Sequence, residues 1–301
     1  MRIVISGASG LMGKALTDAL RADGHGVAHL VRAGGSPSAG DIPWDPASER
    51  IDAAALEGAD AVVNLNGASI AGGRWTRAYK AVLRSSRIDA TRLLVTTLAQ
   101  LQRKPRVFLS ASAVGFYGNR GDEILTETSL PGTDFLALLA SEWEAEATRA
   151  AQAGIRTVLL RFGVILSGNG GALPRMLLPF RLGVGGRFGS GKQWISWIAL
   201  KDAVGIVRAA IEDERFEGPI NVVAPNPLRN GEFTRSVART LHRPAIFPVP
   251  TFALRLALGE MADALLLVSQ RAIPERLTAM GYSFRFPDFD AALRTALGRT
   301  R

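Results

Sequence analysis

Short apolar runs of four to seven residues recur through the first 165 residues of the chain. They are rich in β-branched residues and bounded by glycine or polar residues, which is typical of buried strands. The runs that we expect to form strands are Ile3–Ser6, Val27–Val31, Ala59–Leu65, Arg106–Ser110 and Thr157–Phe162.

Apolar residues at helical spacing fill the gaps between these runs. In Leu11–Ala22 the apolar positions recur every three or four residues, and Gly24 follows as a helix stop. Thr76–Leu101 and Phe135–Ala153 show similar spacing, and we expect each to be helical throughout. Strands that alternate with helices predict βαβ units, so the expected fold is α/β, a Rossmann-like, doubly wound parallel sheet.

The pattern changes after about residue 165. Glycine and proline cluster over residues 167–191, whereas Leu200–Glu212 has helical spacing and Ile220–Val223 is a further apolar run. We expect these last two segments to return to the sheet as a helix and a strand.

These changes predict two domains. Residues 1–165, rejoined by about 195–223, are expected to form the Rossmann-like domain. Residues 166–194 and 224–301 are expected to form a smaller C-terminal α/β domain on the substrate side.

A glycine-rich turn, Gly7–Gly13, follows the first expected strand and opens the first expected helix. Gly7 permits the tight turn, Gly10 lets the backbone approach a diphosphate, and Gly13 lets the helix pack against the strand. Backbone N–H groups at the positive end of the helix would then hold the diphosphate. The turn therefore predicts a dinucleotide cofactor, contacted by Gly7, Ser9, Gly10, Leu11, Met12 and Gly13.

The end of the second expected strand bears on which dinucleotide binds. Sites for NAD often have Asp or Glu about 20 residues after the glycine-rich turn, where the carboxylate binds the ribose 2′-hydroxyl. Here the stretch ends in Arg32, and no acid occurs before Asp41. A guanidinium pairs well with a 2′-phosphate, so Arg32 predicts NADP(H), a solvated arginine being the alternative.

Motifs elsewhere in the chain carry a resemblance to a known family. They are Trp44–Pro46, Asn64–Gly67, Arg74–Thr76, Ser86–Arg87, Ser110–Gly118, Arg161–Val164, Gly191–Ile198 and Ser269–Arg271. With them the chain resembles the extended short-chain dehydrogenase/reductase superfamily, and more narrowly its atypical, YfcH-like epimerase family. The resemblance implies an NAD-dependent epimerase/dehydratase-like domain with the family's C-terminal domain, and further cofactor contacts from Asn66, Gly67, Ala68, Arg87, Ser110 and Val164.

The catalytic pair that is usual in that superfamily is missing. Its ordinary members use Tyr and Lys four residues apart on one helix face, where the lysine lowers the pKa of the tyrosine. None of the three tyrosines here has a lysine four residues further on. If Glu144 matches the glutamate that often follows the pair, Leu136 and Ala140 replace the tyrosine and the lysine.

Tyr117 and Ser112 are the candidates to replace the pair. Both follow the fourth expected strand, near the place expected for the nicotinamide. For Tyr117, proton transfer, packing against substrate or cofactor, and a half-buried structural role stay open. For Ser112, orientation of a carbonyl and a role as a capped loop serine stay open.

Composition bears on the remaining classes of site. The chain has no cysteine and three scattered histidines, so we expect no metal site. The formal net charge of +9 is dispersed, and we expect no nucleic-acid partner. No apolar run approaches the roughly 20 residues of a membrane span, so we expect a soluble, cytoplasmic protein without membrane contact.

Two functions stay open at this point. One is an NADP(H)-dependent oxidoreductase or epimerase acting on an unknown small-molecule substrate. The other is a non-catalytic NADP(H)-sensing binding protein, linked to cell division through a label carried by some members of the resembled family. A homodimer is also open, and the fold alone does not choose among these alternatives.

Overall fold

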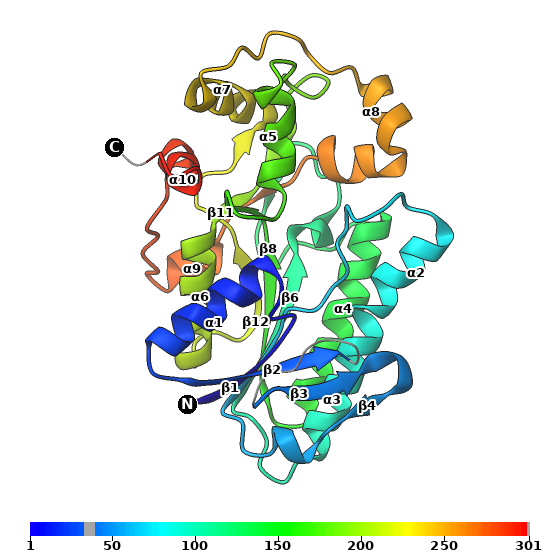
Figure 1. Ribbon diagram of the computed structural model, residues 1–301, viewed down its shortest axis with the longest axis vertical. Coiled ribbons are helices and arrows are strands. Elements are labelled where there is room, and N and C mark those ends of the chain that lie inside the picture. The colour runs from blue at the N-terminus through cyan, green and yellow to red at the C-terminus, as the bar shows by residue number, and fades with distance from the viewer. Residues whose placement is uncertain (33–39, 300–301) are drawn as a thin grey trace. The chain divides into compact units, whose positions relative to one another are not determined.

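An eight-stranded sheet is the main feature of the computed structural model, which describes residues 1–32 and 40–299 (Figure 1). The strand order is β12-β8-β6-β5-β1-β2-β3-β4. Its strands are β1 (Arg2–Ser6), β2 (Gly26–Arg32), β3 (Ile42–Asp45), β4 (Arg50–Ile51), β5 (Ala61–Asn64), β6 (Val107–Ala113), β8 (Arg156–Phe162) and β12 (Gly218–Val222).

The pairing within this sheet is mostly parallel. β1 pairs in parallel with both β2 and β5, and β2–β3 and β5–β6 are also parallel pairs. The short edge strand β4 runs antiparallel to β3. The Rossmann-like fold class expected from the sequence is confirmed, as are the five strands expected before residue 165 and the strand near residue 220.

One expected helix is two helices. Thr76–Leu101 divides into α2 (Arg77–Ser85) and α3 (Ile88–Gln100), so the prediction of a continuous helix was wrong. The Ser86 hydroxyl donates to the carbonyl of Leu83 and accepts from the N–H of Ala68. Side-chain bonds of this kind compete with the helical ladder, and they hold the chain at the break.

The contacts group the chain into two compact units. The first comprises Met1–Ser112, Leu139–Leu160 and Val204–Ile220, and the second comprises Ala113–Leu138, Arg161–Ala203 and Asn221–Arg301. The two units are of nearly equal length, and their bounds differ from the domain boundaries expected from the sequence. Whether those expected boundaries delimit separately folding domains stays a prediction.

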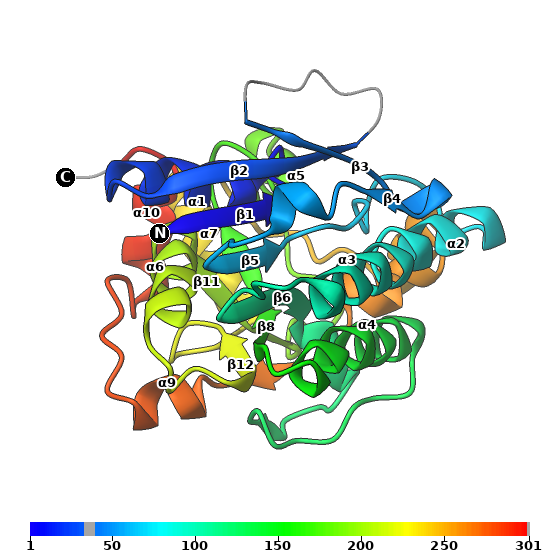
Figure 2. The same ribbon diagram turned by 90° about the horizontal axis from the view of Figure 1, so that it is seen from below.

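Helices cover both faces of the sheet in the first unit. Figure 2 shows α1 (Leu11–Ala22) and α6 (Leu200–Glu212) on one face, and α3 and α4 (Phe135–Gln152) on the other. Val62 and Phe108 on the strands pack with Leu94 and Leu98 of α3, and all four are fully buried. Each such side chain contributes about 1.5–3 kcal/mol by leaving water, so this layer fixes where the strand ends lie.

The second unit has its own aromatic core. The Trp197 ring lies 5.1 Å from that of Phe289, edge to face, and Phe233 packs 5.4 Å from Phe289. The segment Trp194–Trp197 is interrupted at Ser196 and contributes to two short strands. The elements not yet named are β7 (Ile124–Leu125), β9 (Val164–Leu166), α5 (Leu173–Arg181), β10 (Trp194–Ile195), β11 (Trp197–Ala199), β13 (Leu228–Arg229), α7 (Asn230–Leu241), α8 (Thr251–Leu258), β14 (Arg271–Ala272), α9 (Glu275–Ala279) and α10 (Phe289–Ala296).

Candidate cofactor site

A cleft of about 680 Å³ lies at the carboxyl ends of β1 and β2 in the first unit. The strand order reverses at β1, because β2 lies on one side of it and β5 on the other. Ligands of open α/β sheets bind at such a reversal. The residues lining the cleft are Gly7, Ala8, Ser9, His29, Leu30, Val31, Arg32, Trp44, Asp45 and Asn66.

The glycine-rich turn forms one wall of this cleft. Gly7 has a φ of +72°, and a Cβ there would lie 2.5 Å from the carbonyl oxygen of Leu65. Gly10 is the N-cap of α1, and neither a capping side chain nor an acidic residue is present in the first turn. Among the described residues, the first N–H groups of α1 therefore have no side-chain acceptor, which suits an anion at the helix start.

Asn66 supplies a donor that lacks an acceptor. Its Nδ2 atom is buried and has no hydrogen-bond partner among the described residues, although Asn66 lines the cleft. An unpaired buried donor costs about 1–3 kcal/mol. A ligand oxygen in the cleft would remove that cost, so Asn66 fits a bound nucleotide.

Arg32 is the basic side chain of the cleft that has no counterion. It is exposed at the end of β2, and no ion pair joins it to any residue in the described ranges 1–32 and 40–299. His29, by contrast, has Nδ1 3.1 Å from an Asp41 oxygen and Nε2 3.2 Å from the Thr17 hydroxyl. A guanidinium without a carboxylate partner fits a phosphate.

Asp45, the acidic residue of the cleft, is held by its own turn. Its carboxylate accepts from the Ser48 hydroxyl and the Ala47 N–H, and these hydrogen bonds hold the pKa of Asp45 below its usual value. The carboxylate is therefore bound locally rather than paired with Arg32.

Arg87 is a buried cation beside the segment that follows β5. Its guanidinium donates to the carbonyls of Leu83 and Ala68, and Cζ lies 5.2 Å from the centre of the Trp143 ring. A Cβ on Gly67 would lie 2.8 Å from that Cζ, so Gly67 makes room for the guanidinium. Burial lowers the pKa of Arg87 to about 10, which still leaves it charged at neutral pH.

Ser110 lies in a buried hydrogen-bond network rather than on the cleft wall. Its hydroxyl accepts from Nδ2 of Asn64, which also donates to Thr91 and whose Oδ1 accepts from Ser6. Val164 lies in the second unit, where β9 pairs with β11. Cofactor contacts from Ser110 and Val164, as from Leu11, Met12, Gly13 and the other residues expected, stay predictions.

Comparison with known proteins identifies the family. Residues 3–223 match the model of the NAD dependent epimerase/dehydratase family, and residues 249–296 match a domain of unknown function, DUF1731. The chain belongs to the NAD-dependent epimerase/dehydratase family. The family and the C-terminal module expected from the sequence motifs are thereby confirmed.

Two relatives of this epimerase-family chain match it from end to end. Epimerase family protein Mb2239 of Mycobacterium bovis is 43% identical over 297 residues, which are 99% of this chain and 98% of that protein. The crystal structure of human epimerase family protein SDR39U1 (isoform 2) with NADPH is 35% identical, with a TM-score of 0.90 and complete coverage of both chains. Both relatives carry the family name, and the human structure contains NADPH.

The first unit of this epimerase-family protein also holds Ser112, a candidate catalytic residue. Its hydroxyl donates to Oε1 of Glu144 at 2.6 Å, and both side chains are buried. The bond ties β6 to α4 and occupies the proton of Ser112. A role for Ser112 in orienting a substrate carbonyl stays a prediction.

The second unit holds Tyr117, the other candidate, which is fully buried rather than half-buried. The Tyr117 hydroxyl donates to Oδ1 of Asn221 at 2.6 Å and accepts from Nη1 of Arg161 at 3.0 Å. Burial raises the pKa of Tyr117 above its ordinary value, so the hydroxyl is protonated at neutral pH. Its part in proton transfer stays a prediction.

We expect Tyr117→Phe to lower the free energy of unfolding by about 1–3 kcal/mol, because Asn221 and Arg161 would each lose a buried partner. The folded-state pKa is raised, so this contribution is complete below the ordinary pKa of 10.0 and is lost as the pH rises through the folded-state pKa. Urea titrations from pH 7 to 11 should show the difference between the two proteins shrinking above pH 10.

Tyr79→Phe is the matched control, because the Tyr79 hydroxyl donates to the Ser69 carbonyl in an exposed position where water can replace it. It should change the stability little. An unchanged stability of Tyr117→Phe, or a gap that widens at high pH, would contradict the buried geometry of Tyr117.

Sequence reasoning did not assign six of the residues that line the cleft. The most informative of them, Trp44 and Asp45, are carried by β3, whose register places Trp44 opposite Arg32. The motif Trp44–Pro46 was noted in the sequence as part of the family resemblance. The sequence did not show that this motif lies beside the second strand. The six are Ala8, His29, Leu30, Val31, Trp44 and Asp45.

In the part of the chain that the structure describes, no helix is long and apolar enough to cross a membrane. No group of three or more His, Asp or Glu side chains within residues 1–32 and 40–299 is arranged to hold a metal ion.

Proposed function

We propose that this chain binds NADP(H) in the cleft of the first unit and acts as an oxidoreductase or epimerase on a small molecule. The observation that carries the proposal is Arg32, a guanidinium without a counterion among the described residues, in a cleft that is also lined by Gly7–Ser9 of the turn that leads into α1. The match to a family defined by NAD dependence and the NADPH in the human relative support it.

Different residues of the cleft would bind different parts of the cofactor. The N–H groups at the start of α1 would hold the diphosphate, Arg32 the 2′-phosphate, and Nδ2 of Asn66 an oxygen of the nucleotide. Bound NADP(H) supplies or accepts the hydride, while the protein supplies placement and electrostatics. The side chains of Leu136 and Ala140 have no acidic proton to donate. Water or Tyr117 would therefore have to supply the proton of the reaction, and the Tyr117 hydroxyl would first have to release Asn221.

A second candidate function is NADP(H) binding without turnover. The residues that favour it are Leu136 and Ala140 on α4, together with the occupied hydroxyls of Ser112 and Tyr117. One measurement distinguishes the two functions: the rate of NADPH oxidation in the presence of each compound of a carbonyl library. Turnover with any compound supports an enzyme, and NADPH binding without turnover supports a sensor.

The cofactor assignment is tested by comparing the affinities for NADPH and NADH. We expect NADPH to bind at least about tenfold more tightly, a difference of about 1.4 kcal/mol, because Arg32 pairs only with the 2′-phosphate. Arg32→Ala should remove that preference by weakening NADPH while leaving NADH unchanged. Fluorescence titration of each dinucleotide gives both constants.

Arg21→Ala is the matched control, because Arg21 lies in the last turn of α1, away from the residues that line the cleft. It should leave both affinities as they are. Equal affinities of the unmodified protein for NADPH and NADH would defeat the assignment of Arg32.

A further inference from the structure

Large apolar side chains gather on the surface of the second unit. Leu182 and Val184 follow α5, Ile246 and Phe247 precede α8, and Phe252 lies in its first turns. All five are between 61% and 76% exposed. Exposed apolar patches of this kind mark binding surfaces in water-soluble proteins. We call these five residues the apolar face.

Hydrogen bonds join the two segments that carry most of the apolar face. The N–H of Val249 donates to the carbonyl of Arg187 at 2.8 Å, and the N–H of Gly189 donates to the carbonyl of Val249 at 2.9 Å. A Cβ on Gly186 would overlap the carbonyl oxygen of Phe247. The segment 182–189 therefore lies directly against 246–249, so their exposed side chains share one surface.

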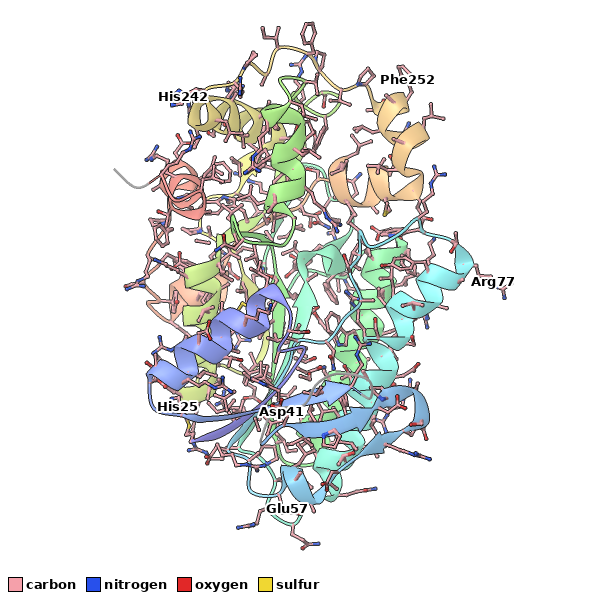
Figure 3. The ribbon with its side chains drawn as sticks, viewed as in Figure 1. His25, Asp41, Glu57, Arg77, His242 and Phe252 are labelled. Carbon is pink, nitrogen blue, oxygen red and sulfur yellow. The ribbon has the colours of Figure 1, made fainter. Side chains whose placement is uncertain are left out.

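A cleft lined with arginine borders the apolar face. It has a volume of about 240 Å³ and is lined by Arg181, Arg243 and Arg299 with Leu241 and Leu297. Arg181 directly precedes Leu182, and Arg243 lies three residues before Ile246. Figure 3 shows His242, next to Arg243, and Phe252 at the same end of this unit, on opposite sides of the view.

The charge of this region has one sign over long stretches. Residues 166–201 contain five Lys or Arg and no Asp or Glu, and residues 233–259 contain four Arg and no Asp or Glu. Arg239 and Arg255 are neutralised by Asp290 and Asp263. The three arginines of the cleft have no ion pair within the described part of the chain, so they leave a local positive charge beside the apolar face.

We propose that the apolar face and the arginine cleft together bind an anionic phospholipid bilayer. Aromatic and aliphatic side chains enter the headgroup region of a bilayer, and neighbouring arginines attract anionic lipid. A lipid phosphate fits the arginine cleft, because guanidinium groups bind phosphate well. Such a contact needs no spanning helix, and the proposal departs from the expectation from the sequence that the protein meets no membrane, which stays untested.

A second copy of the chain fits this surface less well, because residues 166–201 and 233–259 contain no Asp or Glu, so the same surface of another copy offers the arginines no acidic partner. A bound peptide is disfavoured as well, since the apolar face lines neither of the two clefts described above. The arginines also lie at or just beyond the ends of α5, α7 and α10, where cations offset the negative helix ends. That role alone predicts an effect on stability and none on lipid binding.

The test is co-sedimentation of the full chain with vesicles. Vesicles of phosphatidylcholine with 30% phosphatidylglycerol should bind the protein, whereas pure phosphatidylcholine should bind it at least tenfold more weakly. The binding should weaken as the salt concentration rises. Phe247→Ser and Arg181→Glu should each reduce binding at least about tenfold, because they remove an apolar contact or reverse a charge.

Matched controls keep these results interpretable. Leu130→Ser changes an equally exposed apolar residue outside the apolar face, and Arg215→Glu changes an exposed arginine of the first unit, so both should bind like the unmodified protein. All four variants should keep the NADPH affinity of the parent chain, which separates this proposal from the cofactor assignment.

Three outcomes would overturn the lipid proposal. They are no binding to anionic vesicles, equal binding to zwitterionic ones, and a dimer in solution that Phe247→Ser dissociates in the absence of any vesicle binding. If Arg181→Glu lowers the stability without weakening vesicle binding, the only role of Arg181 is to offset the negative end of α5.

Discussion

Gly13→Ala should raise the dissociation constant for NADPH at least about 100-fold, which corresponds to about 2.7 kcal/mol. A Cβ at position 13 would lie 2.4 Å from the carbonyl oxygen of Gly7 and 2.6 Å from Cα of Ala8. Both are backbone atoms of the turn, so the added methyl group must displace the turn itself. Displacement misplaces the N–H groups that we propose hold the diphosphate. Fluorescence titration with NADPH measures the effect.

The steric effect opposes the intrinsic preference of the helix. Alanine is more favourable than glycine inside a helix by about 1 kcal/mol, so weaker binding by Gly13→Ala cannot come from helix propensity. Gly26→Ala is the control, since the nearest atom to its Cβ would be the carbonyl oxygen of Met1 at 3.8 Å. A folded Gly13→Ala protein that binds NADPH normally would show that the turn does not hold the cofactor.

The parts of the fold that the sequence predicted are those with local causes. Ile3–Ser6 is a buried strand because three of its four side chains are apolar, and Gly7–Gly13 turns because its glycines permit close approach. The cleft could thus be placed from one strand, one turn and one helix. Arg32 could be added because it ends the next strand along the chain.

The remaining parts depend on partners far away in the sequence. β3 has four residues and contains Pro43, which hides its strand pattern, and only its register with β2 brings Trp44 beside Arg32. The break between α2 and α3 depends on Ala68, whose N–H donates to the Ser86 hydroxyl. No spacing rule connects such residues, so the far wall of the cleft and the helix break could not be predicted.

The surroundings of Tyr117 show the same limit. Its place in the sequence suggested proton transfer, but its two hydrogen-bond partners, Asn221 and Arg161, come from β12 and β8. Whether the Tyr117 hydroxyl can serve a substrate depends on how firmly these partners hold it. The loss of unfolding free energy when Arg161 is truncated measures how strongly these hydrogen bonds restrain the Tyr117 hydroxyl.

Arg161→Ala should lower the free energy of unfolding by about 3–5 kcal/mol. The Arg161 guanidinium is buried, donates to the Tyr117 hydroxyl and the Glu127 carbonyl, and lies 3.6 Å from the centre of the Phe116 ring. Truncation leaves two buried acceptors without a donor and a space beside the ring. Chemical denaturation followed by tryptophan fluorescence measures the change.

Arg255→Ala gives the contrast that makes this loss informative. Arg255 lies in the same unit and donates several hydrogen bonds to Asp263, but both side chains are more than half exposed, so its removal should cost less than about 1 kcal/mol. A large loss confined to Arg161→Ala means that Tyr117 is firmly held and that water is the better proton source. Equal, small losses in both variants would mean a loosely held cluster, in which the Tyr117 hydroxyl is free to turn toward a substrate.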